Sequence, residues 1–100
     1  MNMQQMIMQA QKMQRELKKA KDELAKQEFT VTKGGAVTVV MMGDKTIKSV
    51  SIDEDAFDAE NKEMVEDLLA LAFNELYAQV DALETKIEEK ITGKAGGFGF

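Results

Sequence analysis

Apolar residues in the first quarter of the chain recur at spacings of alternately three and four positions. The members of this seam are Met3, Met6, Ala10, Met13, Leu17, Ala20 and Leu24. No glycine or proline occurs before Gly34, so the pattern predicts a helix from near the N-terminus to about Lys26. At about 1.5 Å per residue this helix would be roughly 36 Å long. A seam of methionine, alanine and leucine fits two arrangements equally, a helix packed on its own domain and a helix-helix seam.

The stretch from Phe29 to Ile52 shows the alternation and turn residues of short antiparallel strands. Turns are expected at the glycine pair 34–35 and at Gly43. The middle strand is expected at residues 37–42, and a third β-rich run ends at Ile52. These features predict a three-stranded antiparallel sheet.

The middle strand carries apolar side chains on both faces, because side chains alternate along a strand with period two. Val37, Val39 and Met41 share one face, and Val40 and Met42 share the other. So small a protein can cover one face of its sheet with its own helices, so the second face is expected to pack against another copy. The sequence therefore predicts a homodimer. The candidate interface residues are Val37, Val39, Val40, Met42, Leu69 and Phe73.

A second long helix is predicted from Lys62 to about Ile91, where apolar residues again recur every three or four positions. Asn61 is the expected N-cap, and Gly93 is expected to end the helix. The acidic stretch at residues 53–63 lies at the N-terminal end of this helix, where negative side chains interact favourably with the helix dipole. Its spacing does not match a calcium-binding EF-hand loop, so no metal site is assigned.

These elements together predict an α+β fold in the order α-β-β-β-α. A single domain is expected over residues 1–92, followed by a flexible glycine-rich tail at residues 93–100. At a length of 100 residues the core is modest, and dimerisation would add to it.

The composition excludes most site chemistry, because the sequence contains neither cysteine nor histidine. No catalytic residue, cofactor or small-molecule substrate is assigned, and an enzyme is the weakest functional class. No apolar run approaches the roughly 18 residues that span a bilayer, and the N-terminus lacks the features of a signal peptide. A soluble, cytoplasmic protein without a membrane partner is expected.

The net charge of −5 is unevenly distributed along the chain. Residues 1–27 carry a charge of +3, whereas residues 53–89 carry a charge of −11. A basic stripe on the first helix includes three lysines spaced by seven residues, and its members are Lys12, Arg15, Lys18, Lys19 and Lys26. Acidic residues four positions away offer partners to most of these cations, which is typical of a solvated helix face. Taken alone, the stripe favours a solvated face over a binding surface, and it would become a binding surface only if dimerisation placed two such stripes side by side.

Several segments in order give the chain a resemblance to a known family. They are the first-helix sequence MQQMIMQAQKMQREL, the pair 34–35, Gly43, the strand end VSID at residues 50–53, and residues 66–74, EDLLALAFN. In this order the chain resembles the YbaB/EbfC family of bacterial nucleoid-associated proteins over essentially its whole length. One departure is Glu54, which stands where family members often have proline.

The resemblance implies a tweezer-like homodimer that binds double-stranded DNA with little or relaxed sequence preference. It also implies a place in the nucleoid, a role in nucleoid organisation or gene regulation, and helical arms that face the DNA. Lys12, Arg15, Lys18, Lys19 and Lys26 are then the candidate DNA-binding residues. The alternative is a prefoldin-like coiled-coil holdase or protein-interaction adaptor that uses its soft helical surfaces. The salt dependence of binding distinguishes DNA binding from a holdase or adaptor role, because phosphate contacts weaken with ionic strength and apolar contacts do not.

Overall fold

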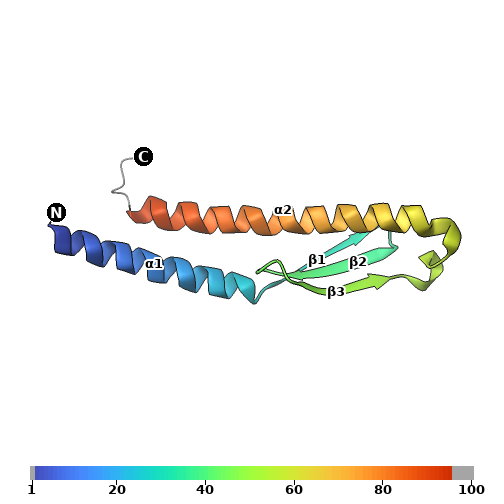
Figure 1. The fold of residues 1–100 in the computed structure, drawn as a ribbon, viewed down its shortest axis with the longest axis horizontal. Helices are drawn as coiled ribbons and strands as arrows, with labels where there is room; N and C mark the ends of the chain where they lie inside the picture. The colour runs from blue at the N-terminus through green and yellow to red at the C-terminus, as the bar shows by residue number, and fades with distance from the viewer. Residues whose placement is uncertain (1, 96–100) are drawn as a thin grey trace.

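A computed structural model describes residues 2–95 and has the predicted α-β-β-β-α order (Figure 1). The elements are α1 (Met3–Ala25), β1 (Glu28–Lys33), β2 (Val37–Met42), β3 (Ile47–Ile52), two 3-10 turns η1 (Glu54–Ala56) and η2 (Ala59–Asn61), and α2 (Lys62–Ala95). The fold class predicted from the sequence is therefore confirmed. Residues 96–100 of the predicted tail lie outside the described residues.

The molecule is elongated, with extents of 68 × 24 × 14 Å. Helix α2 runs along almost its whole length, with its first half over the sheet and its second half beside α1 (Figure 1). The two helices run in opposite directions, because the sheet turns the chain back between them (Figure 1). One end of the molecule is thus a helix on a sheet, and the other is an arm of two helices.

The first hairpin turn has the conformation that its glycine pair predicts. Gly34 and Gly35 have φ angles of 60° and 62°, and the Ala36 N–H donates to the Lys33 carbonyl oxygen at 3.0 Å. Two successive positive φ angles match the right-handed twist of the strands, and glycine adopts them without steric cost. This turn fixes the β1-β2 register, in which Val31 lies opposite Val39.

The second glycine turn has a different physical cause. Gly43 does not have a positive φ angle, and the left-handed residue in this turn is Lys45, with φ of 70°. A Cβ atom on Gly43 would lie only 1.8 Å from the carbonyl oxygen of Leu24. The Gly43 N–H also donates to the Gln27 carbonyl oxygen at 3.0 Å. Glycine is therefore needed here because the end of α1 packs directly on the turn.

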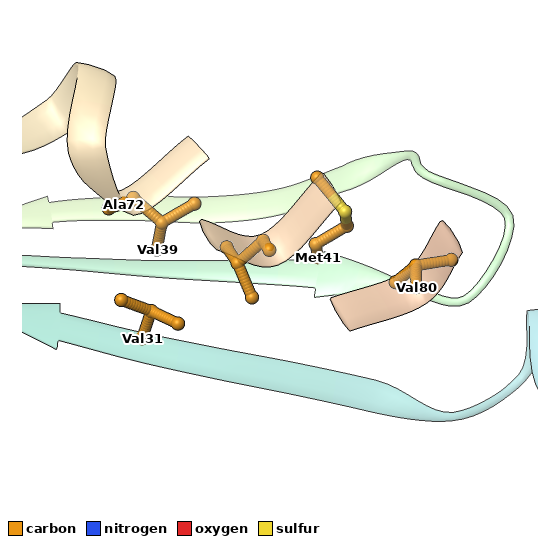
Figure 2. Packing of buried hydrophobic residues seen from close by; sticks show 6 residues of the cluster. Val31, Val39, Met41, Ala72 and Val80 are labelled. Carbon is orange, nitrogen blue, oxygen red and sulfur yellow. The ribbon is translucent and has the colours of Figure 1, made fainter. Parts of the chain in front are cut away.

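The main core lies between the sheet and α2 within one chain (Figure 2). Its buried members are Val31, Val39 and Met41 from the strands and Ala72, Leu76 and Val80 from the helix. A second cluster contains Val37, which is 1% exposed, beside Ala36 and Ala56.

This packing corrects part of the predicted dimer interface. Val37 and Val39 are covered by α2 and its neighbours in the same chain, so neither offers surface to a second copy. Val40 and Met42 point to the far face of the sheet and remain half-buried. The sequence pattern identified two faces of β2, but it did not show which face the chain covers itself.

The far face of the sheet is also more polar than the middle strand alone suggests. Val40 is flanked across the strands by Thr30 and Ser49. Next to them, the hydroxyl groups of Thr32 and Thr38 lie 3.0 Å apart and share a hydrogen bond. Val40 is therefore an apolar position within a surface of hydroxyl side chains.

Helix α2 continues through Gly93 to Ala95, beyond the predicted end near Ile91. Glycine ends a helix when it takes a left-handed conformation, but inside a helix it only lowers stability by about 1 kcal/mol relative to alanine. Gly93 does not have a positive φ angle and is helical. At the other end, Asn61 is the last residue of η2 and directly precedes α2.

Candidate nucleic-acid interface

The seam of α1 becomes more buried toward the C-terminal end of the helix. Met3 and Met6 are exposed, Leu24 is buried, and the members between them are half-buried, namely Ala10, Met13, Leu17 and Ala20. Lys21 links the two helices through an ion pair with Glu88 at 3.0 Å. In its C-terminal part the seam therefore packs on a helix of the same chain, so the two arrangements that the sequence left open are here combined.

The predicted basic stripe lies on the opposite side of α1 from the seam. The period of 3.6 residues per turn places the seam and the stripe on opposite sides of α1, so they cannot both face α2. All five candidate cations are exposed, and they are Lys12, Arg15, Lys18, Lys19 and Lys26. The structure therefore brings the five predicted residues together on one outward surface, which we call the basic face of α1.

Most cations of this face lack a carboxylate partner. Lys18 pairs with Asp22 at 2.8 Å, and the hydrogen bond to that carboxylate raises the pKa of Lys18. Within residues 2–95 no ion pair engages the other members, Lys12, Arg15, Lys19 and Lys26. Four cations on this exposed surface thus form no direct ion pair, although Asp22 and Glu23 lie on the same surface as Arg15, Lys19 and Lys26.

The three lysines of the sheet and its turns are in the opposite situation. Each forms an ion pair with a carboxylate from another part of the chain, and two of the three reach α2. The pairs are Lys33 with Glu75, Lys45 with Asp81 and Glu84, and Lys48 with Glu28. The hydrogen bond to Asp81 raises the pKa of Lys45. The acidic α2 therefore neutralises Lys33 and Lys45, whereas four of the five cations on the basic face of α1 have no ion pair within residues 2–95.

One cation near this face was not found from the sequence. Lys90 of α2 lies with Lys19 of α1 along a groove of about 520 Å³ between the two helices. The groove also contains Glu16 and Glu23, and its floor is Ala20, Ile87 and Ile91. Lys90 was missed because it follows the acidic part of the chain. The spacing of Lys86 and Lys90, four residues apart at the end of α2, was the available signal.

A second surface feature is apolar and lies along the inner face of β3. Helix α2 packs over β1 and β2, and β3 remains largely uncovered. Val50 is 46% exposed, although its neighbour across the strands is the fully buried Val39. Phe57, at the end of the same surface, is 80% exposed.

This surface continues onto one side of α2. A groove of about 410 Å³ runs between Ile52, Phe57 and Leu69. Phe73 and Tyr77 follow Leu69 at intervals of four residues, which places them on the same side of the helix. The predicted interface residues Leu69 and Phe73 thus lie beside the uncovered strand. We call this the β3 apolar surface, made of Val50, Ile52, Phe57, Leu69, Phe73 and Tyr77.

No helix within residues 2–95 has the length and apolar character to cross a membrane. In the same range, no three acidic side chains are grouped closely enough to hold a metal ion.

These features define a class of small α+β proteins in which a two-helix arm presents unpaired cations and a short sheet carries the core. The chain belongs to the YbaB/EbfC DNA-binding family, which matches residues 1–95. A nucleoid-associated protein of Mycoplasmopsis pulmonis is 42% identical over 91 residues, which cover 91% of this chain and 90% of that protein. Nucleoid-associated proteins of Acetivibrio thermocellus and Xylella fastidiosa are 39% and 45% identical, over 96% and 81% of this chain and 86% and 76% of their own lengths.

Proposed function

We propose that this chain is a nucleoid-associated protein that binds double-stranded DNA through the basic face of α1. It acts in the nucleoid of the bacterial cytoplasm and contributes to nucleoid organisation or gene regulation. One observation carries this proposal: four exposed cations on one helix face lack carboxylate partners, while the lysines of the sheet are ion-paired. Membership of the DNA-binding family supports it.

The spacing of the cations suits a phosphate backbone. Lys12, Lys19 and Lys26 follow one another every seven residues, which corresponds to about 10.5 Å along a helix. Phosphates of one DNA strand advance about 3.4 Å along the duplex axis per base pair, so three steps cover a similar distance. Phosphate contacts position a protein without specifying bases. Binding through this face is therefore expected to have little or relaxed sequence preference.

The test removes the unpaired cations and compares the result with the removal of paired ones. The first variant carries Lys12→Gln, Arg15→Gln, Lys19→Gln and Lys26→Gln. The control carries Lys33→Gln, Lys45→Gln, Lys48→Gln and Lys62→Gln, which remove the same charge from lysines that are ion-paired. Gel-shift titrations at two salt concentrations, on several unrelated duplexes, compare both with the wild type.

The first variant is expected to bind all duplexes more weakly and to lose about one unit of salt slope for each contact removed. The control is expected to keep most of the affinity and the slope. Circular dichroism establishes that both variants are folded. Equal losses in the two variants would show that net charge, and not the basic face of α1, determines binding.

We also propose that the chain is a homodimer in which a second copy covers the β3 apolar surface. Exposed apolar patches rimmed by polar residues are typical of protein-protein interfaces. Tyr77 is 40% exposed and Val50 46% exposed in a single chain, and aromatic residues are enriched in such interfaces. β3 is also an edge strand of the sheet, so its outer backbone groups are available to a partner strand.

Two aspartate substitutions distinguish this surface from the far face of the sheet. Val50→Asp places a charge in the β3 apolar surface, and Val40→Asp places the same charge in the hydroxyl-rich far face. Burying an unpaired charge is strongly unfavourable, so the substitution in the true interface should convert dimer to monomer. Light scattering at micromolar concentration measures the mass. We expect Val50→Asp to be monomeric and Val40→Asp to remain dimeric. A folded wild-type monomer would contradict the dimer itself.

A further inference from the structure

The first part of α1 differs from the rest of the arm in both charge and surroundings. Residues 2–11 contain no ionisable side chain, and the first charged residue is Lys12. We call residues 2–11 the charge-free segment. Helix α1 extends past the end of α2 (Figure 1), and every residue from Asn2 to Met8 is exposed. Gln11 is exposed as well, whereas Gln9 and Ala10 are half-buried.

The isolation of this segment matters for its fit to DNA. A single α-helix with its side chains is about 10–12 Å wide, and the major groove of B-DNA is about 12 Å wide. The remainder of the arm contains two helices side by side, which are too wide for the groove. The charge-free segment is thus the part of α1 that can enter a major groove.

The side chains on one face of this segment have the chemistry of base recognition. Gln4, Met8 and Gln11 are separated by four and three residues, so they share a helix face. Arg15 continues that face one turn later, and it belongs to the basic face of α1. Within residues 2–95, no hydrogen bond uses the side-chain amide of Gln4 or Gln11, and both residues are exposed.

Each of these groups has a partner on an A·T base pair. A glutamine amide can form a bidentate pair with adenine, in which the amide nitrogen donates to N7 and the amide oxygen accepts from the N6 amino group. An apolar side chain such as methionine can contact the thymine methyl group. Base edges inside the groove require neutral donors and acceptors, whereas phosphates attract the cations that follow along the same face.

We propose that the charge-free segment enters the major groove and recognises A·T base pairs through Gln4, Met8 and Gln11. The basic face of α1 holds the neighbouring phosphates at the same time. This inference rests on the proposed function and adds to it a modest base preference. The competing occupant is a second copy of the chain, which would cover the exposed seam residues Met3 and Met6 on the other side of the helix.

The experiment compares wild type with a variant that carries Gln4→Ala and Gln11→Ala. The matched control carries Asn74→Ala and Gln79→Ala, which remove two exposed amides from α2. Selection from a randomised duplex library gives the preferred sequence. Fluorescence anisotropy then gives the affinity ratio between this duplex and a G·C-only duplex of equal length. Alanine favours helix, so the variant keeps its fold.

Wild type and control are expected to prefer an A·T-containing duplex. In the variant with Gln4→Ala and Gln11→Ala, the affinity ratio between the selected duplex and the G·C-only duplex should fall by about fivefold or more for each amide removed. The salt slope of this variant should be unchanged, because no phosphate contact is removed. As a second readout, deoxyuridine in place of thymine should weaken wild type but not a Met8→Ala variant, since only the methyl group is lost.

Four results would overturn the inference. Wild type could bind DNA without an A·T preference, which refutes base recognition and leaves the proposed function intact. The double glutamine variant could keep the full preference, or it could change its mass in light scattering, which would assign the segment to contacts between copies. Failure of wild type to bind any duplex would refute the inference and the proposed function together.

Discussion

At the scale of single residues, the turn between β2 and β3 determines how the arm joins the sheet. Gly43 admits the last turn of α1 so closely that no side chain fits between them. Lys45, two residues later, takes a left-handed conformation and pairs with Asp81 of α2. One short turn therefore contacts both helices, and we expect its residues to be sensitive to substitution.

Gly43→Ala is expected to destabilise the protein by about 2 to 3 kcal/mol, because the new Cβ atom forces backbone shifts in a packed region. The matched substitution is Gly93→Ala in α2, where the new Cβ meets no atom within 4 Å. It should stabilise the helix by up to about 1 kcal/mol. Urea denaturation of both variants tests the pair. A neutral Gly43→Ala would show that α1 does not pack on this turn in solution.

Asp44 in the same turn is expected to give a measurable acid dependence. The Thr46 hydroxyl and the Thr46 backbone N–H bond to its carboxylate and lower its pKa from the ordinary 3.8. A lowered pKa adds stability that is present above pH 3.8 and is lost as pH falls through the folded-state value. Asp44→Asn should therefore be less stable than wild type at pH 7, with a difference that narrows in acid. A difference that stays constant with pH would contradict this role of the carboxylate.

At the scale of elements, α1 is one helix with two environments. Its C-terminal half packs on α2 and on the turn at Gly43, where Leu24 is 4% exposed. Its N-terminal half continues the same apolar spacing, but Met3 and Met6 are 77% and 57% exposed. The spacing therefore predicts the helix correctly without revealing how far its partner extends.

This division predicts different costs for two substitutions in the same seam. Leu24→Ala should destabilise by about 2 to 5 kcal/mol, the range for truncating a buried leucine. Met6→Ala should change stability by less than about 0.5 kcal/mol, as is usual for exposed positions. Thermal denaturation at low and high protein concentration measures both. A large, concentration-dependent effect of Met6→Ala would mean that a second copy covers this half of the seam.

The elements themselves were accessible from the sequence because each has a local signal. Helical spacing gave both helices, and the pair Gly34 and Gly35 gave the first turn. The predicted helix end at Gly93 was wrong, because nothing in the sequence distinguishes a glycine inside a helix from one that ends it. The sequence also could not assign the faces of β2, since Val39 and Val40 have the same chemistry and only the path of α2 buries one of them.

At the scale of the whole molecule, charge is segregated in space as well as along the chain. The acidic α2 neutralises lysines of the sheet through pairs such as Lys33 with Glu75, which are far apart in sequence. The basic face of α1 lies on the side of the helix opposite the seam, and four of its five cations form no ion pair within residues 2–95. The net charge of −5 therefore does not describe the surface that DNA would meet.

The candidate cations were predictable from their spacing in the sequence, but whether each one forms an ion pair was not. Of the possible pairs between residues four apart on α1, the structure forms the one between Lys18 and Asp22 within its described residues. Sequence spacing shows only that a pair is possible. Lys90 reaches the same region from the other helix, and only the antiparallel packing of α1 and α2 brings it there.

The most direct test of DNA binding through the basic face of α1 is the salt dependence of wild-type affinity for an arbitrary duplex. Four unpaired cations per chain predict a slope of log affinity against log salt of about −3.6, or about −7 if both copies of a dimer engage. Anisotropy titrations between 50 and 200 mM salt, roughly the range in which such contacts weaken steeply, measure it. A steep, linear loss of affinity agrees with the account. Affinity that is absent, or that does not fall with salt, would contradict it and would favour binding through the apolar helical surfaces.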